Sequence, residues 1–124
     1  MIRAIRLFPG SDGSSHVEEG YLDAGRAAVT SLYVAESPAH SALDWHDAPE
    51  RQYVITLSGT LEFTTRNGET FVLHPGDMLI AEDRSGTGHS WRLIDNDPWR
   101  RAYVVLAEDA AVPFVATGKA RSQP

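Results

Sequence analysis

The chain has 124 residues, of which 42% are hydrophobic and 23% charged, with a formal net charge of −6 and no cysteine. This length suits one domain with one core, and without thiols any metal has to be held by nitrogen and oxygen donors. The acidic balance, with eleven scattered basic residues, argues against nucleic acid as a partner, and no apolar run reaches the roughly 20 residues that a membrane helix needs. A small molecule is therefore the expected ligand.

Short β-strands are expected along the chain, because turn signals recur at close intervals and the segments between them are rich in β-branched and aromatic residues. The first segment alternates and carries two arginines, which is typical of a strand and not of a secretion signal, so a cytoplasmic location is expected. The window 21–28 contains Gly25 and follows a Gly/Ser-rich loop, so at most one helical turn is expected there. In chain order the predicted strands are 2–8, 27–35, 51–57, 60–66, 70–73, 78–81, 89–94 and 100–106.

The dipeptide Asn67-Gly68 separates two of these segments and predicts a hairpin. Both residues tolerate positive φ angles, so 61–73 is expected to form an antiparallel pair joined by a type I′ turn. Eight or more short strands must protect their edges, which favours a closed barrel or a two-sheet jelly roll. Composition alone does not separate these folds from an open sandwich.

Two stretches resemble the motifs of the cupin family, G-x5-H-x-H-x(3,4)-E-x6-G and P-x-G-x5-P-x-G-x2-H. In the first, Gly59 fits the closing glycine and Gln52 stands where the family usually has glutamate. Counting back from Gln52 places His46 at the first histidine and Ala48 at the second, so one of the two usual histidines is present. The longer spacing would instead place Asp47 at the second histidine position and Trp45 at the first.

The second motif is represented by Pro75-Gly76-Asp77 and by His89, which is the counterpart of the family's last ligand; the second proline is absent. The resemblance covers about 43–106. It implies an all-β fold, a double-stranded β-helix or jelly-roll barrel, in which residues 1–116 form one domain with motifs at about 44–59 and 75–89. The polar tail 117–124 is expected to fray. The resemblance also implies a homodimer, since cupins commonly pair through their sheets.

Together with the alternation of side chains along strands, the resemblance makes His46, Gln52 and His89 candidate ligands of one divalent metal at the mouth of the barrel, with Zn, Ni, Mn and Fe all open. In the alternative interpretation the pocket is metal-free and the same three side chains are hydrogen-bonded. A carboxamide adds no negative charge, so a metal held this way is bound more weakly and stays more electrophilic, which favours Lewis-acid chemistry. Asp44 and Asp47 are the candidates for a further, carboxylate ligand.

Glu82 and Asp83 are the candidate catalytic groups. They act either as a general base near the pocket or by ordering the loop 84–88 through hydrogen bonds to its backbone. Arg51 is expected to be a solvated edge charge, and the alternative is that it pairs with Glu50 or with an acidic substrate. Three histidines in or beside turns are expected to face solvent: His16, His40 and His74.

The leading functional hypothesis is a small cupin that binds a divalent metal and acts as a Lewis acid on a small oxygenated organic molecule, as an isomerase, lyase or hydrolase. The first alternative is a non-catalytic barrel that binds a small ligand in a metal-free polar pocket. The second is an iron-dependent dioxygenase, which would need a carboxylate ligand such as Asp44.

Overall fold

Within residues 1–118, the part of the chain that the computed structural model describes, the backbone forms eleven β-strands and no helix, and therefore no helix able to cross a membrane. In chain order the strands are β1 (Ile2–Pro9), β2 (Ser15–Leu22), β3 (Val29–Ser37), β4 (Ala42–His46), β5 (Gln52–Ser58), β6 (Leu61–Thr65), β7 (Thr70–Leu73), β8 (Met78–Ala81), β9 (His89–Leu93), β10 (Trp99–Leu106) and β11 (Phe114–Gly118).

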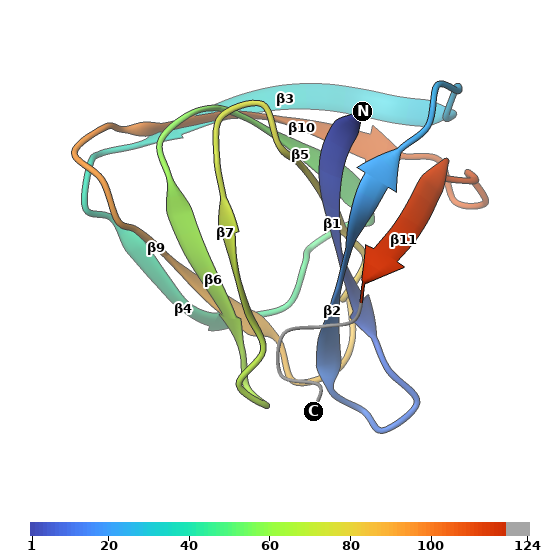
Figure 1. Ribbon diagram of the computed structural model, residues 1–124, viewed down its shortest axis with the longest axis horizontal. Helices are drawn as coiled ribbons and strands as arrows, with labels where there is room; N and C mark the ends of the chain where they lie inside the picture. The colour runs from blue at the N-terminus through green and yellow to red at the C-terminus, as the bar shows by residue number, and fades with distance from the viewer. Residues whose placement is uncertain (119–124) are drawn as a thin grey trace.

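The strands form two sheets that enclose a shared core (Figure 1). One sheet has seven strands in the order β11-β2-β1-β8-β5-β10-β3, and the other has four in the order β4-β9-β6-β7. Neighbouring strands are antiparallel except β1 and β8, which run parallel. The expected all-β jelly roll is confirmed.

The main core lies between the sheets because the strands alternate and turn their apolar side chains inward. Leu7 from β1 and Val54 from β5 belong to the same buried cluster as Phe63 from β6. The Phe63 ring lies edge-on to Trp99 of β10 at 6.3 Å and stacks on Phe71 of β7 at 4.8 Å. Aromatic rings therefore join the two sheets in the middle of the molecule.

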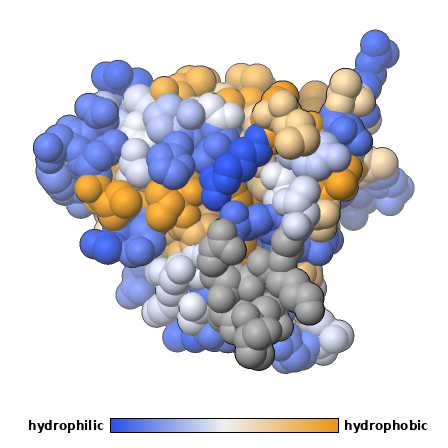
Figure 2. Space-filling view, in the orientation of Figure 1, coloured by the Kyte–Doolittle hydropathy of each residue, from blue (hydrophilic) through white to orange (hydrophobic). Residues whose placement is uncertain are grey.

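The outer face of the seven-stranded sheet is covered only in part. A second buried cluster contains Tyr53 and Ile80, and the segment that leads into β11 packs on it through Ala110 and Val112. Farther along the same face, three apolar side chains, which we call the outer apolar patch, remain 60–70% exposed: Leu32, Val34 and Leu57. Orange patches along the upper rim in Figure 2 lie where β3 runs in Figure 1.

The eight strands expected from the sequence are all present, with ends within two residues of those predicted. Three others were not predicted: β2, β4 and β11. The strand β2 is polar, but its charges are paired, for example Glu18 with Arg6 at 3.2 Å, and it hydrogen-bonds to a strand on each side. Tertiary pairing thus overrides weak strand propensity.

The window 21–28 forms no helical turn, within the expectation of at most one, because Tyr21 and Leu22 complete β2 and pair with β1 and β11. Thr117 of the predicted frayed tail lies in β11, while 119–124 are outside the described residues.

The hairpin of β6 and β7 is antiparallel as expected, but its turn is not type I′. Gly68 has φ of 89°, whereas Asn67 does not have a positive φ. The amide of Gly68 donates to the carbonyl of Thr65 at 3.0 Å, and the amide of Thr65 donates to the carbonyl of Glu69 at 2.9 Å. This is the three-residue loop in which a type I turn is followed by a left-handed glycine, because the register of Thr65 opposite Glu69 leaves three residues to connect them.

Candidate functional site

A cavity of about 350 Å³ lies between the two sheets, within the size range of small-molecule sites. Apolar and aromatic side chains such as Val54, Trp91 and Trp99 form much of its wall. The imidazoles of His46 and His89 also line it. The cavity therefore combines an apolar body with a few convergent polar groups.

His46 and His89 come from neighbouring strands of the four-stranded sheet. His46 is the last residue of β4 and pairs with His89, the first residue of β9. Their ring centres are 4.4 Å apart. When two imidazoles bind one ion, each Nε2 lies about 2.1 Å from it; if the Nε2–ion–Nε2 angle is a right angle, the ring centres are roughly 4.6 Å apart. The observed distance between the ring centres of His46 and His89 therefore suits a shared ion.

Both imidazoles are held through Nδ1. The Nδ1 of His46 lies 2.8 Å from the backbone carbonyl oxygen of Asp44, which can only accept, so a neutral His46 carries its proton on Nδ1. The Nδ1 of His89 lies 2.5 Å from Oδ2 of Asp83. Burial lowers the pKa of His46, against the opposing effect of the hydrogen bond to Asp44. Within residues 1–118, no hydrogen bond occupies Nε2 of either ring.

Gln52 is the first residue of β5 and is 2% exposed. It lines the cavity together with Val54, two residues farther along the strand, as the alternation predicts. Its Oε1 accepts a long hydrogen bond of 3.4 Å from the hydroxyl of Tyr33 on β3. The structure thus places His46, Gln52 and His89 around the same cavity.

Asp83 lies behind His89 and is fully buried. Its Oδ2 also accepts from Ser15 Oγ at 3.2 Å, and Ser15 Oγ accepts from the amide of Gly88 at 3.1 Å. Its Oδ1 is the one buried side-chain polar atom without a partner among residues 1–118. Asp83 is absent from the cavity wall, so it acts on the cavity through His89 while it also orders the loop before β9.

Glu82 does not join this site. It is adjacent to Asp83 and its side chain lies on the opposite side of the chain, where it does not line the cavity. Its oxygens accept from Nε of Arg6 and Nε of Arg51, each at 2.5 Å. Burial alone would raise the pKa of Glu82, but the two guanidinium groups outweigh burial and lower it.

The expectation that Arg51 is a solvated charge was wrong, because its guanidinium group pairs with Glu82.

The two aspartates near His46 also point elsewhere. Asp44 and Asp47 are both exposed, and neither lines the cavity. The register of β4 against β9 shifts between Leu43 and His46, so Asp44 does not share the cavity face with His46. The carboxylate of Asp44 instead accepts from the amide of Trp45 at 2.9 Å.

Comparison with protein families supports this architecture. A family model described as a cupin domain matches residues 33–105, which is more than half of the chain. The chain belongs to the cupin family. Among solved structures, it is similar to the crystal structure of a Cupin_2 domain of an XRE family transcriptional regulator from Enterobacter cloacae, with 20% identity and a TM-score of 0.36, over 86% of this chain and 98% of that one. No curated protein matches the chain.

The donor set of this cupin can be compared with what a metal needs. Within residues 1–118, no group of three or more His, Asp or Glu side chains is arranged to hold an ion. Gln52 supplies an amide oxygen on the cavity wall as a further donor. Two imidazoles with available Nε2 atoms and one amide oxygen fit a borderline divalent cation.

Sequence reasoning missed a cationic group in the cupin cavity. Arg101 of β10 is 9% exposed and lines the cavity beside Tyr103. Its guanidinium carbon lies 3.9 Å from the centre of the Trp99 ring. The alternation of Trp99, Arg101 and Tyr103 along a predicted strand could have indicated that the three share a face.

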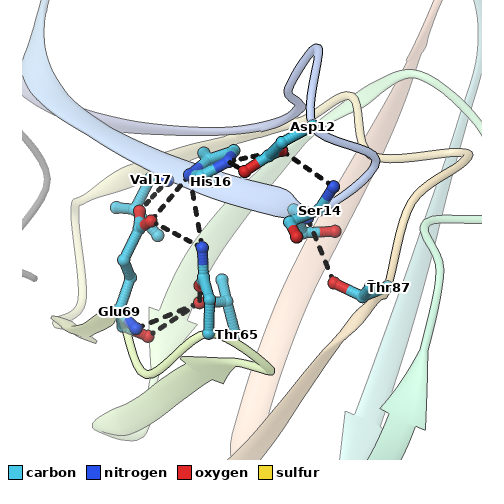
Figure 3. A network of polar contacts seen from close by, with 9 residues as sticks. Asp12, Ser14, His16, Val17, Thr65, Glu69 and Thr87 are labelled. Carbon is cyan, nitrogen blue, oxygen red and sulfur yellow. Dashed lines mark hydrogen bonds and ion pairs between the residues drawn. The ribbon is translucent and has the colours of Figure 1, made fainter.

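The expectation that His16 faces solvent was wrong, whereas His40 and His74 are exposed. The Nδ1 of His16 lies 2.7 Å from Oε2 of Glu69 and its Nε2 lies 2.9 Å from Oδ1 of Asp12 (Figure 3). The reason is that Ser15–Leu22 is a strand and not a loop, which brings His16 against the β6–β7 hairpin.

Proposed function

We propose that this cupin binds a divalent metal through Nε2 of His46, Nε2 of His89 and Oε1 of Gln52, and that it acts on a small oxygenated organic molecule in the cavity. The observation that carries the proposal is the pair of imidazoles with centres 4.4 Å apart, each held through Nδ1 by an oxygen atom. Zn, Ni, Mn and Fe all accept such a donor set.

Each part of the site has a different role in this proposal. The hydrogen bond from His89 to Asp83 fixes the ring orientation and raises the basicity of Nε2. Gln52 contributes an oxygen without a charge, so the site stays electrophilic. The apolar wall keeps bulk water from the ligand. A bound metal would supply Lewis-acid polarisation of a carbonyl or hydroxyl oxygen, which suits an isomerase, lyase or hydrolase.

Metal content tests this proposal directly. Protein purified without an affinity tag is expected to contain close to one equivalent of a transition metal, measured by inductively coupled plasma mass spectrometry, and His46→Ala and His89→Ala are each expected to contain much less. His74→Ala is the matched control, because this imidazole is exposed and lies outside the cavity. Equal, negligible metal in all four proteins contradicts the proposal.

The second candidate is a non-catalytic ligand-binding cupin with a metal-free polar pocket. The hydrogen bond from Tyr33 to Oε1 of Gln52 favours it, because this acceptor already has a partner. Thermal-shift measurements with metal salts and with small carboxylates or sugars discriminate between the two, since a ligand selective for the folded state raises the melting temperature. An iron-dependent dioxygenase has less support, because Asp44 and Asp47 lie outside the cavity wall.

We also propose that the protein forms a homodimer through its seven-stranded sheet. Support comes from the outer apolar patch, which includes Leu32 and Val34 on the edge strand β3, since such a surface is commonly covered by a partner. Analytical ultracentrifugation is expected to show a dimer for the wild type and a monomer for Val34→Lys. Ile94→Lys, at an exposed apolar position outside the strands of the seven-stranded sheet, is expected to remain dimeric. A wild-type monomer would exclude this assembly.

A further inference from the structure

Arg101 is a buried cation without an acidic partner in the described part of the chain. Its side chain is 9% exposed, and among the residues that line the cavity it is the one with a permanent charge. None of the ion pairs within residues 1–118 includes it. Burying an unpaired charge is unfavourable, so its retention in a cavity points to an anion from outside the protein.

The guanidinium group is held in place by neutral acceptors that leave part of it unused. Its Nε donates to the hydroxyl of Tyr103 at 3.0 Å, and Nη1 donates to Ser37 Oγ at 2.8 Å and to the carbonyl of Trp99 at 3.1 Å. A guanidinium has five N–H donors, and the described residues provide no hydrogen-bond acceptor for Nη2. Stacking on Trp99 at 3.9 Å further fixes its plane. The group is therefore preorganised to bind an anion.

Arg101 and Gln52 mark two ends of one face of the β5–β10 pair. Arg101 lies opposite Thr56 on β5, and Gln52 lies opposite Val105 on β10. Four residues along β5 separate the two positions, which is about 13 Å between backbones. The Nε of Arg101 faces Tyr103, on the side of Gln52, whereas Nη1 contacts Ser37 and Trp99 on the opposite side, so the guanidinium stays at its own end of this face.

We infer that the ligand of this cavity is a small organic carboxylate whose carboxylate group pairs with Arg101 and whose apolar body lies against Val54, Trp91 and Trp99. This inference rests on the proposed function and names the substrate class for the same site. The oxygenated carbon of the ligand then lies toward His46, Gln52 and His89, while the carboxylate anchors the opposite end.

The charge and the wall of the cavity select a carboxylate over a phosphate. One guanidinium balances one negative charge, whereas a phosphate monoester carries nearly two at pH 7. A carboxylate oxygen can accept from the N–H groups of Nη2, which the described residues leave unused. The remaining wall near Arg101 is apolar or aromatic, as with Ala35 and Trp99, and offers no second cation for a dianion.

Matched ligands that differ in charge alone test the inference. Benzoate and benzamide, and isobutyrate and isobutyramide, are titrated into protein that has been stripped of metal with EDTA and dialysed, so that a carboxylate cannot bind through a metal. Quenching of tryptophan fluorescence reports binding, since Trp91 and Trp99 line the cavity. At least one carboxylate is expected to bind about tenfold or more tightly than its amide.

Variants of Arg101 test whether the preference for a carboxylate over its amide depends on this residue. Arg101→Met and Arg101→Gln are expected to lose the preference for the carboxylate and to keep the metal content of the wild type; the glutamine variant serves if the methionine variant does not fold. Arg100→Met is the matched control, because Arg100 is the adjacent residue, is exposed and pairs with Glu36. It is expected to bind as the wild type does.

Three outcomes overturn the inference: equal binding of each carboxylate and its amide, an unchanged preference in folded Arg101 variants, or displacement of benzoate by inorganic phosphate at lower concentration than by isobutyrate. If metal content proves negligible while the carboxylate preference depends on Arg101, the metal proposal fails and this inference stands. If metal is bound and the preference for the carboxylate is absent, this inference fails and the metal proposal stands.

Discussion

Replacing Asp83 with asparagine is expected to weaken metal binding by about 10- to 100-fold and to change the free energy of unfolding little. The carboxylate of Asp83 accepts from Nδ1 of His89 at 2.5 Å and so holds the Nε2 lone pair toward the cavity. A neutral amide lowers the basicity of that imidazole. Folding is less affected, because the buried carboxylate has an oxygen without a partner and its charge is costly to bury.

Isothermal titration of metal-stripped protein with zinc or nickel, alongside urea unfolding, separates these two effects. Ser15→Ala is the matched control, because it removes the other hydrogen bond to Oδ2 of Asp83 and leaves the one from His89. Its metal affinity is expected to stay within a few-fold of the wild type. If Asp83→Asn loses stability and keeps full metal affinity, Asp83 has a structural role alone and is not a positioning residue for His89.

Replacing Glu69 with alanine is expected to lower the free energy of unfolding by about 2–4 kcal/mol. The Glu69 side chain is fully buried at the end of the β6–β7 hairpin, where its Oε1 accepts from the amide of Val17 at 2.7 Å and its Oε2 accepts from Asn67 Nδ2 at 3.0 Å. Val17 belongs to β2, so this carboxylate links the two sheets (Figure 3). Alanine would leave the buried Val17 amide without a partner.

Chemical denaturation measures the effect, with Glu62→Ala as the control. Glu62 lies on the neighbouring strand β6 and forms an exposed ion pair with Arg92, so its loss is expected to change stability by less than about 1 kcal/mol. Similar losses in both variants would show that Glu69 is no more than a surface group in solution.

The same network predicts a pH dependence through His16. Hydrogen bonds to Asp12 and then to Glu69 raise the pKa of His16 above its usual 6.5, against the effect of burial. A raised folded-state pKa stabilises the fold fully below pH 6.5, and this contribution is lost as the pH rises through the folded-state value. His16→Asn is expected to remove that decline from the stability profile. If the free energy of unfolding changes with pH equally in the wild type and in His16→Asn above pH 6.5, the prediction is wrong.

Local patterns in the sequence were sufficient for most of the strands and for the family. Alternation and turn residues located eight strands within two residues, and Gly59 and His89 carried the resemblance to cupins. The same alternation placed Gln52 and Val54 on one face, as found. These features depend on neighbours in the chain, which is why a sequence reveals them.

Features that depend on pairing between distant strands were not accessible in this way. The polar strand β2 could not be recognised by propensity, because its acidic residues are compensated by Arg3 and Arg6 of β1 and not by anything within β2 itself. The turn at Asn67 was assigned one residue too short, because its type depends on which residue of β6 faces Glu69.

The amino-acid sequence by itself thus indicated an all-β jelly roll and named His46, Gln52 and His89 as candidates for one site. Only the tertiary structure decided which acidic groups reach them. A register shift in β4 turns Asp44 away, and the two residues that follow β8 point to opposite sides, with Glu82 among arginines and Asp83 behind His89. It also brought Arg101 into the cavity. Side-chain direction is a local property, but the groups that meet depend on register and on sheet closure, which are set by contacts between residues far apart in the chain.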